Sequence, residues 1–209
     1  EGYCNLAHNA MIASYIACLL PVLLVNSPAA DWKLKKDKDG IAVYTRSVEA
    51  SDVAEFKAVM SVEGTNLQQV LEVLTNVDGF KELFPDCAEA RLLEREGRYN
   101  IVHYIRTKAP FPVDDRDGIY QLRTTISANN TKAVLTLSVL PDRLPRTEGV
   151  VRIPAGSGKW EVEQVGRNVK ILYQFHADPG GSVPAWLVNS AIVDTPYNTM
   201  VNLRRMLQR

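Results

Sequence analysis

The chain has 209 residues, and 46% of them are hydrophobic, which suffices for one domain with a substantial core. Its 24 Lys and Arg residues balance its 24 Asp and Glu residues, so no basic field would attract nucleic acid from a distance. We therefore expect one globular domain, with or without a targeting segment, and no nucleic acid partner.

Residues 1–30 differ in composition from the rest of the chain. Ala10 to Val25 is almost wholly apolar, and the small residues Ser27 and Ala29 fit a signal-peptide cleavage site. No Lys or Arg precedes the apolar run, and the run is short for a membrane span. The segment predicts a removed secretion signal and a periplasmic or secreted protein. The alternatives are an uncleaved membrane anchor, or a structural helix in a cytoplasmic protein.

The body of the chain, residues 31–209, begins with a pattern of strands. Trp32–Lys36 and Ile41–Arg46 flank an Asp-Gly pair at Asp39-Gly40, which is a strong hairpin signal. Glu55–Val62 alternates apolar and polar residues and predicts a third strand, with Phe56, Ala58, Met60 and Val62 on one side.

A helix follows the third strand. Thr65-Asn66-Leu67-Gln68 has the form of a capping box, and Asp78-Gly79 ends the helical pattern. Phe80–Phe84 is long enough for one more helical turn. Strands are then predicted at Ala90–Glu94, Asn100–Thr107, Gly118–Ser127 and Lys132–Val139.

The last third of the chain predicts two more strands and a closing helix. Trp160–Glu163 and Lys170–Ala177 alternate like strands, and Asp178-Pro179-Gly180-Gly181 is a strong break. The chain after Pro184 contains no Gly and, if helical, spans roughly 36 Å. Pro196 should kink or loosen that helix.

One face of the predicted C-terminal helix mixes aliphatic residues with threonine. It comprises Val188, Ile192, Thr195, Thr199, Leu203 and Met206. This stripe fits either an ordinary core helix or a lid over a cavity. Taken together, the pattern predicts an α+β fold in which a strongly bent antiparallel sheet wraps around one long C-terminal helix.

Several motifs in this order resemble the START domain, the lipid-transfer module named for the steroidogenic acute regulatory protein. The resemblance runs from about Trp32 to Leu207. It is carried by Val151-Arg152-Ile153-Pro154 with Gly158-Lys159-Trp160, by Asp178 to Asn189, by Asp194-Thr195-Pro196 and Leu203-Arg204, and by Asp115-Arg116-Asp117.

The resemblance implies a helix-grip fold whose hydrophobic tunnel holds one lipid under the C-terminal helix, without metal, organic cofactor or catalysis. It also implies a charged pair inside the tunnel, which falls on Glu89 and Arg116 in this sequence. A buried charge needs such a partner, although both residues also fit ordinary solvated strand ends.

Strand parity extends the candidate site to further ligand-binding residues. If Arg116 faces the tunnel, Tyr120 and Leu122 do so too, and the same alternation gives Leu135, Leu137, Trp160, Val162, Tyr173 and Phe175. Val188, Ile192 and Thr195 would close the tunnel from the helix. Each of these is equally compatible with plain core packing, and His103 is more typical of a satisfied core histidine.

The sequence contains no phosphate loop, zinc spacing, calcium loop or nucleophile elbow. The resemblance implies a carrier that binds a phospholipid, fatty acyl or sterol-like molecule and contacts membranes transiently. We expect it to be a monomer with a hinge at Gly180-Gly181. The alternatives are a cyclase or aromatase on the same fold, which would use His103, Arg106, Tyr120 and Tyr173, and an interaction module with a filled interior.

Overall fold

The computed structural model describes residues 31–49, 51–183 and 185–209, so the predictions for residues 1–30 lie outside the described residues. The strands are β1 (Lys33–Lys38), β2 (Ile41–Val48), β3 (Ser51–Glu63), β4 (Cys87–Glu96), β5 (Asn100–Thr107), β6 (Asp115–Ile126), β7 (Lys132–Val139), β8 (Val150–Arg152), β9 (Ala155–Val165) and β10 (Asn168–Asp178). The helices are α1 (Leu67–Thr75), a 3-10 turn η1 (Val77–Gly79), α2 (Phe80–Leu83) and α3 (Ala185–Leu207).

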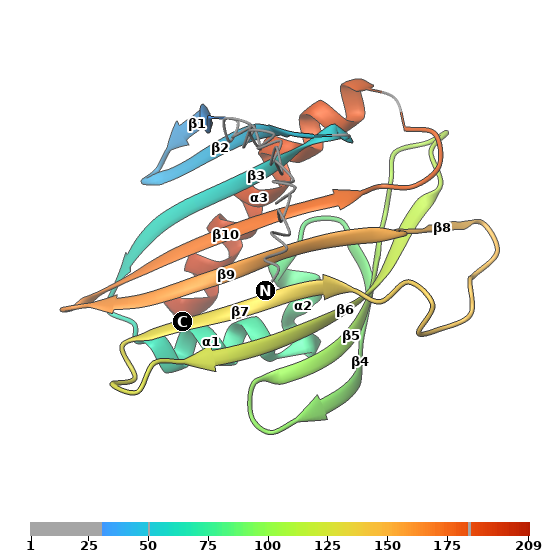
Figure 1. Cartoon of the computed structure of the whole chain (residues 1–209). Coiled ribbons are helices and arrows are strands. Elements are labelled where there is room, and N and C mark those ends of the chain that lie inside the picture. The colour runs from blue at the N-terminus through green and yellow to red at the C-terminus, as the bar shows by residue number, and fades with distance from the viewer. Residues whose placement is uncertain (1–30, 50, 184) are drawn as a thin grey trace, which may run out of the picture.

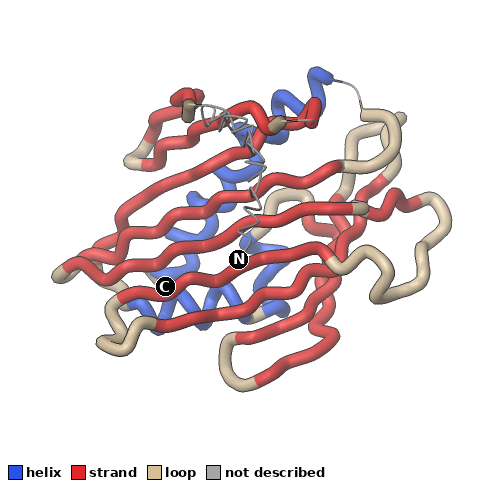
Figure 2. The backbone as a smooth tube through the Cα atoms, viewed as in Figure 1, coloured by secondary structure: helices blue, strands red, loops and turns tan. Residues whose placement is uncertain are grey.

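The strands form one sheet in the order β1-β2-β3-β10-β9-β7-β6-β5-β4, and the short β8 pairs with β6. The β6–β8 pair is parallel, and the other pairs are antiparallel. The sheet is curved but not closed, and α3 crosses its concave side together with α1 and α2 (Figure 1). Figure 2 shows the same arrangement with the helices behind the strands. The predicted α+β helix-grip fold is confirmed.

The first hairpin turns where the sequence predicted, and it also anchors α3. Asp39 and Gly40 have φ angles of 53° and 69°, the left-handed values that an Asp-Gly hairpin turn requires. Tyr197 Oη donates to Asp39 Oδ2 at 2.8 Å, and Arg204 Nη1 donates to Asp39 O at 2.8 Å. The end of the chain is therefore tied to its beginning through one turn residue.

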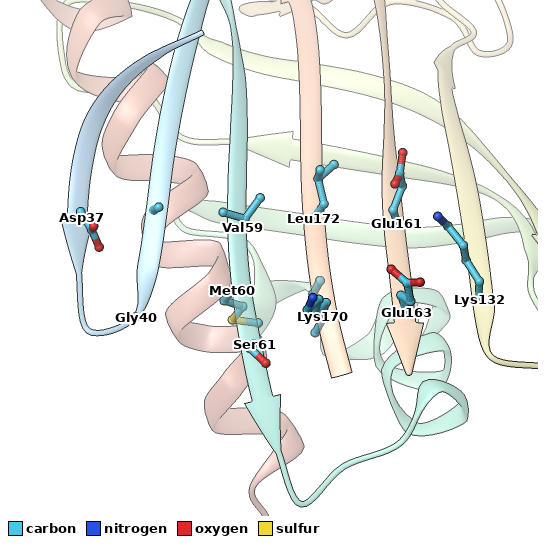
Figure 3. A pocket seen from close by; sticks show the side chains of 12 residues that line it. Asp37, Gly40, Val59, Met60, Ser61, Lys132, Glu161, Glu163, Lys170 and Leu172 are labelled. Atoms are coloured by element: carbon cyan, nitrogen blue, oxygen red, sulfur yellow. The ribbon is translucent and has the colours of Figure 1, made fainter. Parts of the chain in front are cut away.

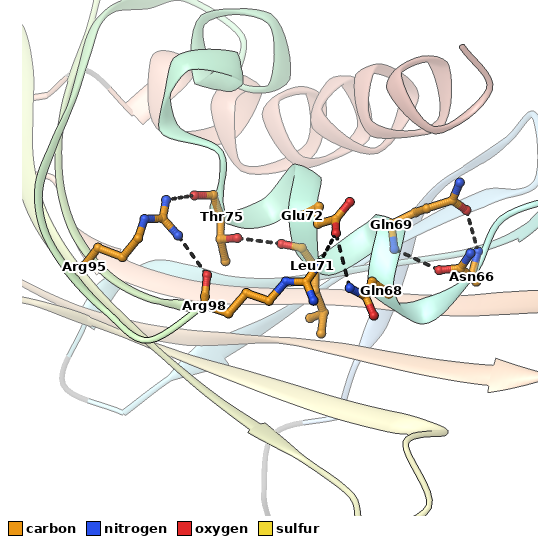
Figure 4. A network of polar contacts seen from close by, with 8 residues as sticks. All are labelled: Asn66, Gln68, Gln69, Leu71, Glu72, Thr75, Arg95 and Arg98. Carbon is orange, nitrogen blue, oxygen red and sulfur yellow. Dashed lines mark hydrogen bonds and ion pairs between the residues drawn. The ribbon is translucent and has the colours of Figure 1, made fainter.

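The α1 helix is capped one residue later than the sequence pattern indicated. Gln69 N donates to Asn66 Oδ1 at 3.0 Å, and Asn66 N donates to Gln69 Oε1 at 3.1 Å, so the box is Asn66–Gln69 rather than Thr65–Gln68. Figure 4 shows this cap and the contacts at the opposite end of the helix. There, Arg95 Nη2 donates to Thr75 O at 2.8 Å and joins α1 to the β4–β5 hairpin.

The α3 helix continues through Pro196 as one element. Its buried face carries Tyr197, Met200 and Leu203, which pack into the main core. Thr199 is also buried and donates its hydroxyl to Thr195 O at 2.9 Å. Thr195 itself is exposed, so the predicted stripe had the wrong rotational phase at this residue. Among the described residues, no helix is both long and apolar enough to cross a membrane.

Candidate functional site

The concave face of the sheet has a sealed end and an accessible end. On β10, Ile171 is buried whereas Phe175 is only partly buried, and on β6, Leu122 is buried whereas Tyr120 is only partly buried. The buried ends share one hydrophobic core with α1 and the C-terminal part of α3. The accessible ends lie toward the side of the sheet where α3 begins, at the right in Figure 1.

Aromatic rings follow one another across the accessible end, and we call this set the aromatic arc. Trp160 stacks on Tyr173 with ring centroids 3.9 Å apart, and Tyr173 meets Phe56 edge-on at 5.0 Å. Between the remaining successive rings, the centroid distances are 6.4 Å for Phe56–Phe175, 6.2 Å for Phe175–Tyr120, 5.6 Å for Tyr120–His103, 5.0 Å for His103–Phe80 and 5.1 Å for Phe80–Phe84. Strands β3, β5, β6, β9 and β10, helix α2 and its C-cap residue Phe84 contribute these residues.

The alternation of side chains along the strands predicted most of the arc. His103, Tyr120, Trp160, Tyr173 and Phe175 were all placed on inward faces, and the structure brings their rings into one connected set. Phe56, Phe80 and Phe84 were missed as site residues. Phe56 was placed on one side of its strand but was not assigned to the site, and strand alternation carries no information about a helical turn. The spacing of four residues between Phe80 and Phe84 is the signal that would have paired those two.

His103 is an uncharged polar group inside the arc. Its side chain is 3% exposed, and Nδ1 has no hydrogen-bond partner among the described residues. Burial lowers the pKa of His103 to about 3, so the imidazole is neutral at physiological pH. Burial also raises the pKa values of the Tyr120 and Tyr173 phenols, which therefore stay protonated. His103 was expected to be a core histidine whose ring nitrogens are hydrogen-bonded, and Nδ1 does not fit that expectation.

Acidification is expected to destabilise the fold through His103. The unfolded chain binds a proton near pH 6.5, whereas the folded chain does so only near pH 3, so the free energy of unfolding falls as pH falls between these values. The contribution is about 1.4 kcal/mol per pH unit. Urea unfolding at pH 6.5 and pH 4.5 should show a smaller difference for His103→Phe than for wild type. A difference in His103→Phe equal to that of wild type would contradict the assignment.

The other predicted lining residues divide between the core and the helix. Leu122, Leu135, Leu137, Trp160 and Val162 are buried in the main core. Val188 and Ile192 on α3 are partly buried, and Thr195 faces solvent. Trp160 also belongs to the arc, whereas Leu137 and Leu122 continue the cross-strand row of Phe175 beyond Gly158. Ligand contacts of the whole set stay a prediction.

The predicted pair of Glu89 and Arg116 is not formed. Glu89 lies 2.9 Å from Arg91 and 3.9 Å from Arg106, measured between carboxylate oxygen and Nε. Arg116 instead donates from Nη1 to Asp114 O at 2.5 Å and from Nη2 to Gly180 O at 3.5 Å. The two charges therefore satisfy different partners.

A β-bulge explains why parity failed for Glu89. Cys87 on β4 pairs with Thr107 on β5, which in turn pairs with Arg116 on β6. The register of β4 shifts between Cys87 and Glu89, so that Glu89 pairs with Arg106. The extra residue moves Glu89 out of the row that holds Arg116. Cys87 occupies the corresponding row, and burial raises the pKa of its thiol.

A buried ion pair does exist, on the outer face of the sheet. Arg152 Nε lies 2.6 Å from Asp117 Oδ1 and Nη2 lies 3.0 Å from Oδ2, and both side chains are 1% exposed. Arg152 also donates to the carbonyl oxygens of Pro141, Leu144 and Pro145 at 2.7, 3.0 and 3.1 Å. It therefore fixes the loop between β7 and β8 onto β6. Arg152 was part of the motif recognised in the sequence, but its partner Asp117 was not predicted.

A cleft of about 690 Å³ lies where β10 ends and α3 begins. It is lined by Ser51, His176, Val188 and the turn around Gly181, and His176 Nε2 lies 3.0 Å from Ser51 Oγ. Gly180 and Gly181 have φ angles of 65° and 60°, which proline does not adopt. Rigid, proline-like replacements are therefore unsuitable for testing the predicted hinge, which stays a prediction.

A second hollow of about 480 Å³ lies on the other side of the sheet (Figure 3). Its apolar floor includes Val59 and Leu172, and its rim carries Lys132, Glu161 and Glu163. In Figure 3 these side chains come from neighbouring strands, and α3 lies behind the sheet. The backbone of the sheet thus separates this charged hollow from the aromatic arc.

Comparison with protein families gives one clear match. The family model described as START domain matches residues 20–209 of this chain. Curated relatives include an uncharacterized protein of Pseudomonas aeruginosa, 34% identical over 88% of this chain and 90% of its own length. Mouse phosphatidylcholine transfer protein is 29% identical over 86% of this chain and 85% of its own length.

Solved structures show the same architecture. The crystal structure of a STAR-related lipid transfer protein from Xanthomonas axonopodis has 36% sequence identity and a TM-score of 0.78, covering 85% of this chain and 99% of that one. Human STARD10, at 19% identity, superimposes with a TM-score of 0.72 over 85% of this chain and 73% of its own, which supports the fold.

Proposed function

The chain belongs to the START domain family, and from that premise we propose that it binds one lipid against the aromatic arc beneath α3 and carries it between membranes. The observation that carries the proposal is the unequal burial of the concave face. Phe56, Tyr120 and Phe175 keep accessible apolar surface on the side of the sheet that α3 covers. Hydrocarbon laid on such surface gains about 25 cal/mol for each Å² removed from water.

A phospholipid is the class of ligand to test first. Mouse phosphatidylcholine transfer protein aligns along most of this chain, and its name states its cargo. The arc offers hydrogen-bonding groups among apolar rings, because the Tyr120 and Tyr173 phenols stay protonated and His103 stays neutral. We propose a carrier role without covalent chemistry, in which these groups hold polar atoms of the lipid.

Membrane contact is assigned to the loop between β5 and β6. Phe111 at its tip is 96% exposed, and Val113 N donates to Pro110 O at 3.0 Å across the turn. Arg116, at the start of β6, joins this region to Gly180 just before α3. The loop and the start of α3 therefore lie together (Figure 1). A lipid leaving the arc beside this loop would enter the membrane directly.

Purification without detergent tests the binding step. The protein is expected to retain one lipid molecule per monomer, which native mass spectrometry detects as an added mass and solvent extraction then identifies. Refolded, lipid-free protein should take up fluorescent phosphatidylcholine from vesicles. Protein that neither retains a lipid nor takes one up would refute the proposal.

Export stays a prediction, since residues 1–30 lie outside the described residues. We propose a periplasmic or secreted monomer from which this segment has been removed. N-terminal sequencing of the protein recovered from a periplasmic fraction checks this, and a mature chain that still contains Ala10 to Val25 would contradict it.

A further inference from the structure

Gly118 lies on the concave face of β6, two residues before Tyr120. A Cβ atom at position 118 would lie 2.5 Å from the Tyr120 hydroxyl oxygen and 2.6 Å from two atoms of its ring. Gly118 is buried within a regular strand, and its φ angle is not positive. The glycine is therefore required by the ring above it and not by a turn.

The ring of Tyr120 lies along the sheet because this position has no side chain. On one flank, the His103 ring stacks against it with centroids 5.6 Å apart and an interplanar angle of 24°. On the other flank, Phe175 lies 6.2 Å away. Both neighbours belong to the packed arc, so a methyl group at position 118 would push the Tyr120 ring away from the sheet on its concave side.

The same arrangement recurs at Gly158 on β9. A Cβ atom there would lie 2.7 Å from Cδ2 of Phe175, and only 2.3 Å from Gln174 O. Phe175 thus also lies flat over a glycine. Because the second contact involves backbone, replacing Gly158 would disturb the pairing of β9 with β10, whereas replacing Gly118 disturbs only a side chain.

We propose that Gly118, by letting Tyr120 lie flat, makes the site wide enough for a lipid with two hydrocarbon chains. The inference rests on the proposed lipid-binding function and names the ligand class for it. Accessible arc surface extends from Phe56 on β3 to Tyr120 on β6, which are four strand steps apart in the sheet order. Because the sheet is curved, the rings lie closer together than the strands: Phe175 lies 6.4 Å from Phe56 and 6.2 Å from Tyr120, so this surface spans at most about 13 Å between ring centroids. One extended acyl chain is about as wide as one strand step, roughly 5 Å, so two chains can lie side by side on it.

The test compares two fluorescent lipids that share a headgroup, phosphatidylcholine with two chains and lysophosphatidylcholine with one. Gly118→Ala in the full chain is expected to weaken binding of the two-chain lipid about tenfold, the typical effect of overpacking a fitted site. Binding of the single-chain lipid is expected to stay within about twofold, since one chain can lie beside the raised ring. The double variant Gly118→Ala/Tyr120→Ala should restore the wild-type ratio of two-chain to single-chain affinity or exceed it, because the loss of the Tyr120 phenol weakens both lipids alike through their shared headgroup.

The outcomes separate this inference from the proposed function. Wild-type protein that binds neither lipid refutes lipid binding itself. Wild-type protein that binds both, with Gly118→Ala unchanged or equally weakened for both, overturns the inference alone. Circular dichroism establishes that Gly118→Ala is folded. If it is not, Tyr120→Ala with the native glycine decides, because it should raise the ratio of two-chain to single-chain affinity, and an unchanged or lower ratio overturns the inference.

Discussion

Arg152→Met is expected to lower the free energy of unfolding by about 3–5 kcal/mol, the usual result of removing one partner from a buried ion pair. Asp117 would remain 1% exposed with its carboxylate unpaired. The carbonyl oxygens of Pro141, Leu144 and Pro145 would lose their donor as well. Urea or thermal unfolding of wild type and variant measures the difference.

A matched control isolates the effect of burial. Arg98 Nη2 lies 2.6 Å from Glu72 Oε1, as close as Arg152 is to Asp117, but its side chain is 62% exposed. Arg98→Met should therefore cost only about 0–1 kcal/mol. The double variant Arg152→Met/Asp117→Leu should recover most of the lost stability, because it removes the stranded charge. A cost for Arg152→Met as small as that for Arg98→Met would contradict a stabilising role for the buried pair.

The pH dependence of Arg152→Met gives an independent check. Without its partner, a buried carboxylate is more costly to keep ionised than to keep protonated. Acid removes the charge and so relieves part of that cost. The stability deficit of the variant should consequently be larger at pH 7 than at pH 4.5, whereas a deficit independent of pH would argue against a stranded carboxylate.

Local patterns predicted the elements of this fold well, because each depends on residues close in sequence. Asp39-Gly40 specified the first hairpin, and the alternation in β6, β9 and β10 placed Tyr120, Trp160 and Tyr173 on the concave face. The long C-terminal helix followed from the chain after Pro184. These features need only the periodicity of side chains and the conformational preferences of turn residues.

The features that the sequence did not predict have a different physical origin. The alternation of side chains along a strand does not reveal a β-bulge. The register shift between Cys87 and Glu89 separates Glu89 from Arg116. The partner of Arg152 lies 35 residues away on another strand, so only the folded loop brings it to Asp117. Gly118 looked like an ordinary strand glycine, since its function depends on how the Tyr120 ring lies. Each missed feature is a tertiary relation rather than a local pattern.

Phe111→Asp is expected to slow lipid transfer between vesicles by at least about tenfold. Phe111 is 96% exposed, and burying such a side chain in a bilayer is worth about 2 kcal/mol, which corresponds to roughly a 30-fold change in membrane partitioning. An aspartate at the tip would lose this contribution and be repelled by anionic lipids. Transfer of fluorescent phosphatidylcholine between donor and acceptor vesicles measures the rate.

A second exposed apolar residue provides a matched control for Phe111→Asp. Leu34 on β1 is another exposed apolar side chain, 53% accessible, on the edge strand of the sheet. Leu34→Asp should leave the transfer rate within about twofold of wild type, because no membrane contact is assigned to that edge. Both variants should still carry one lipid by native mass spectrometry, since neither residue belongs to the arc. Wild-type transfer by Phe111→Asp would show that the protein meets the membrane through some other surface, while loss of bound lipid would place Phe111 in the binding site itself.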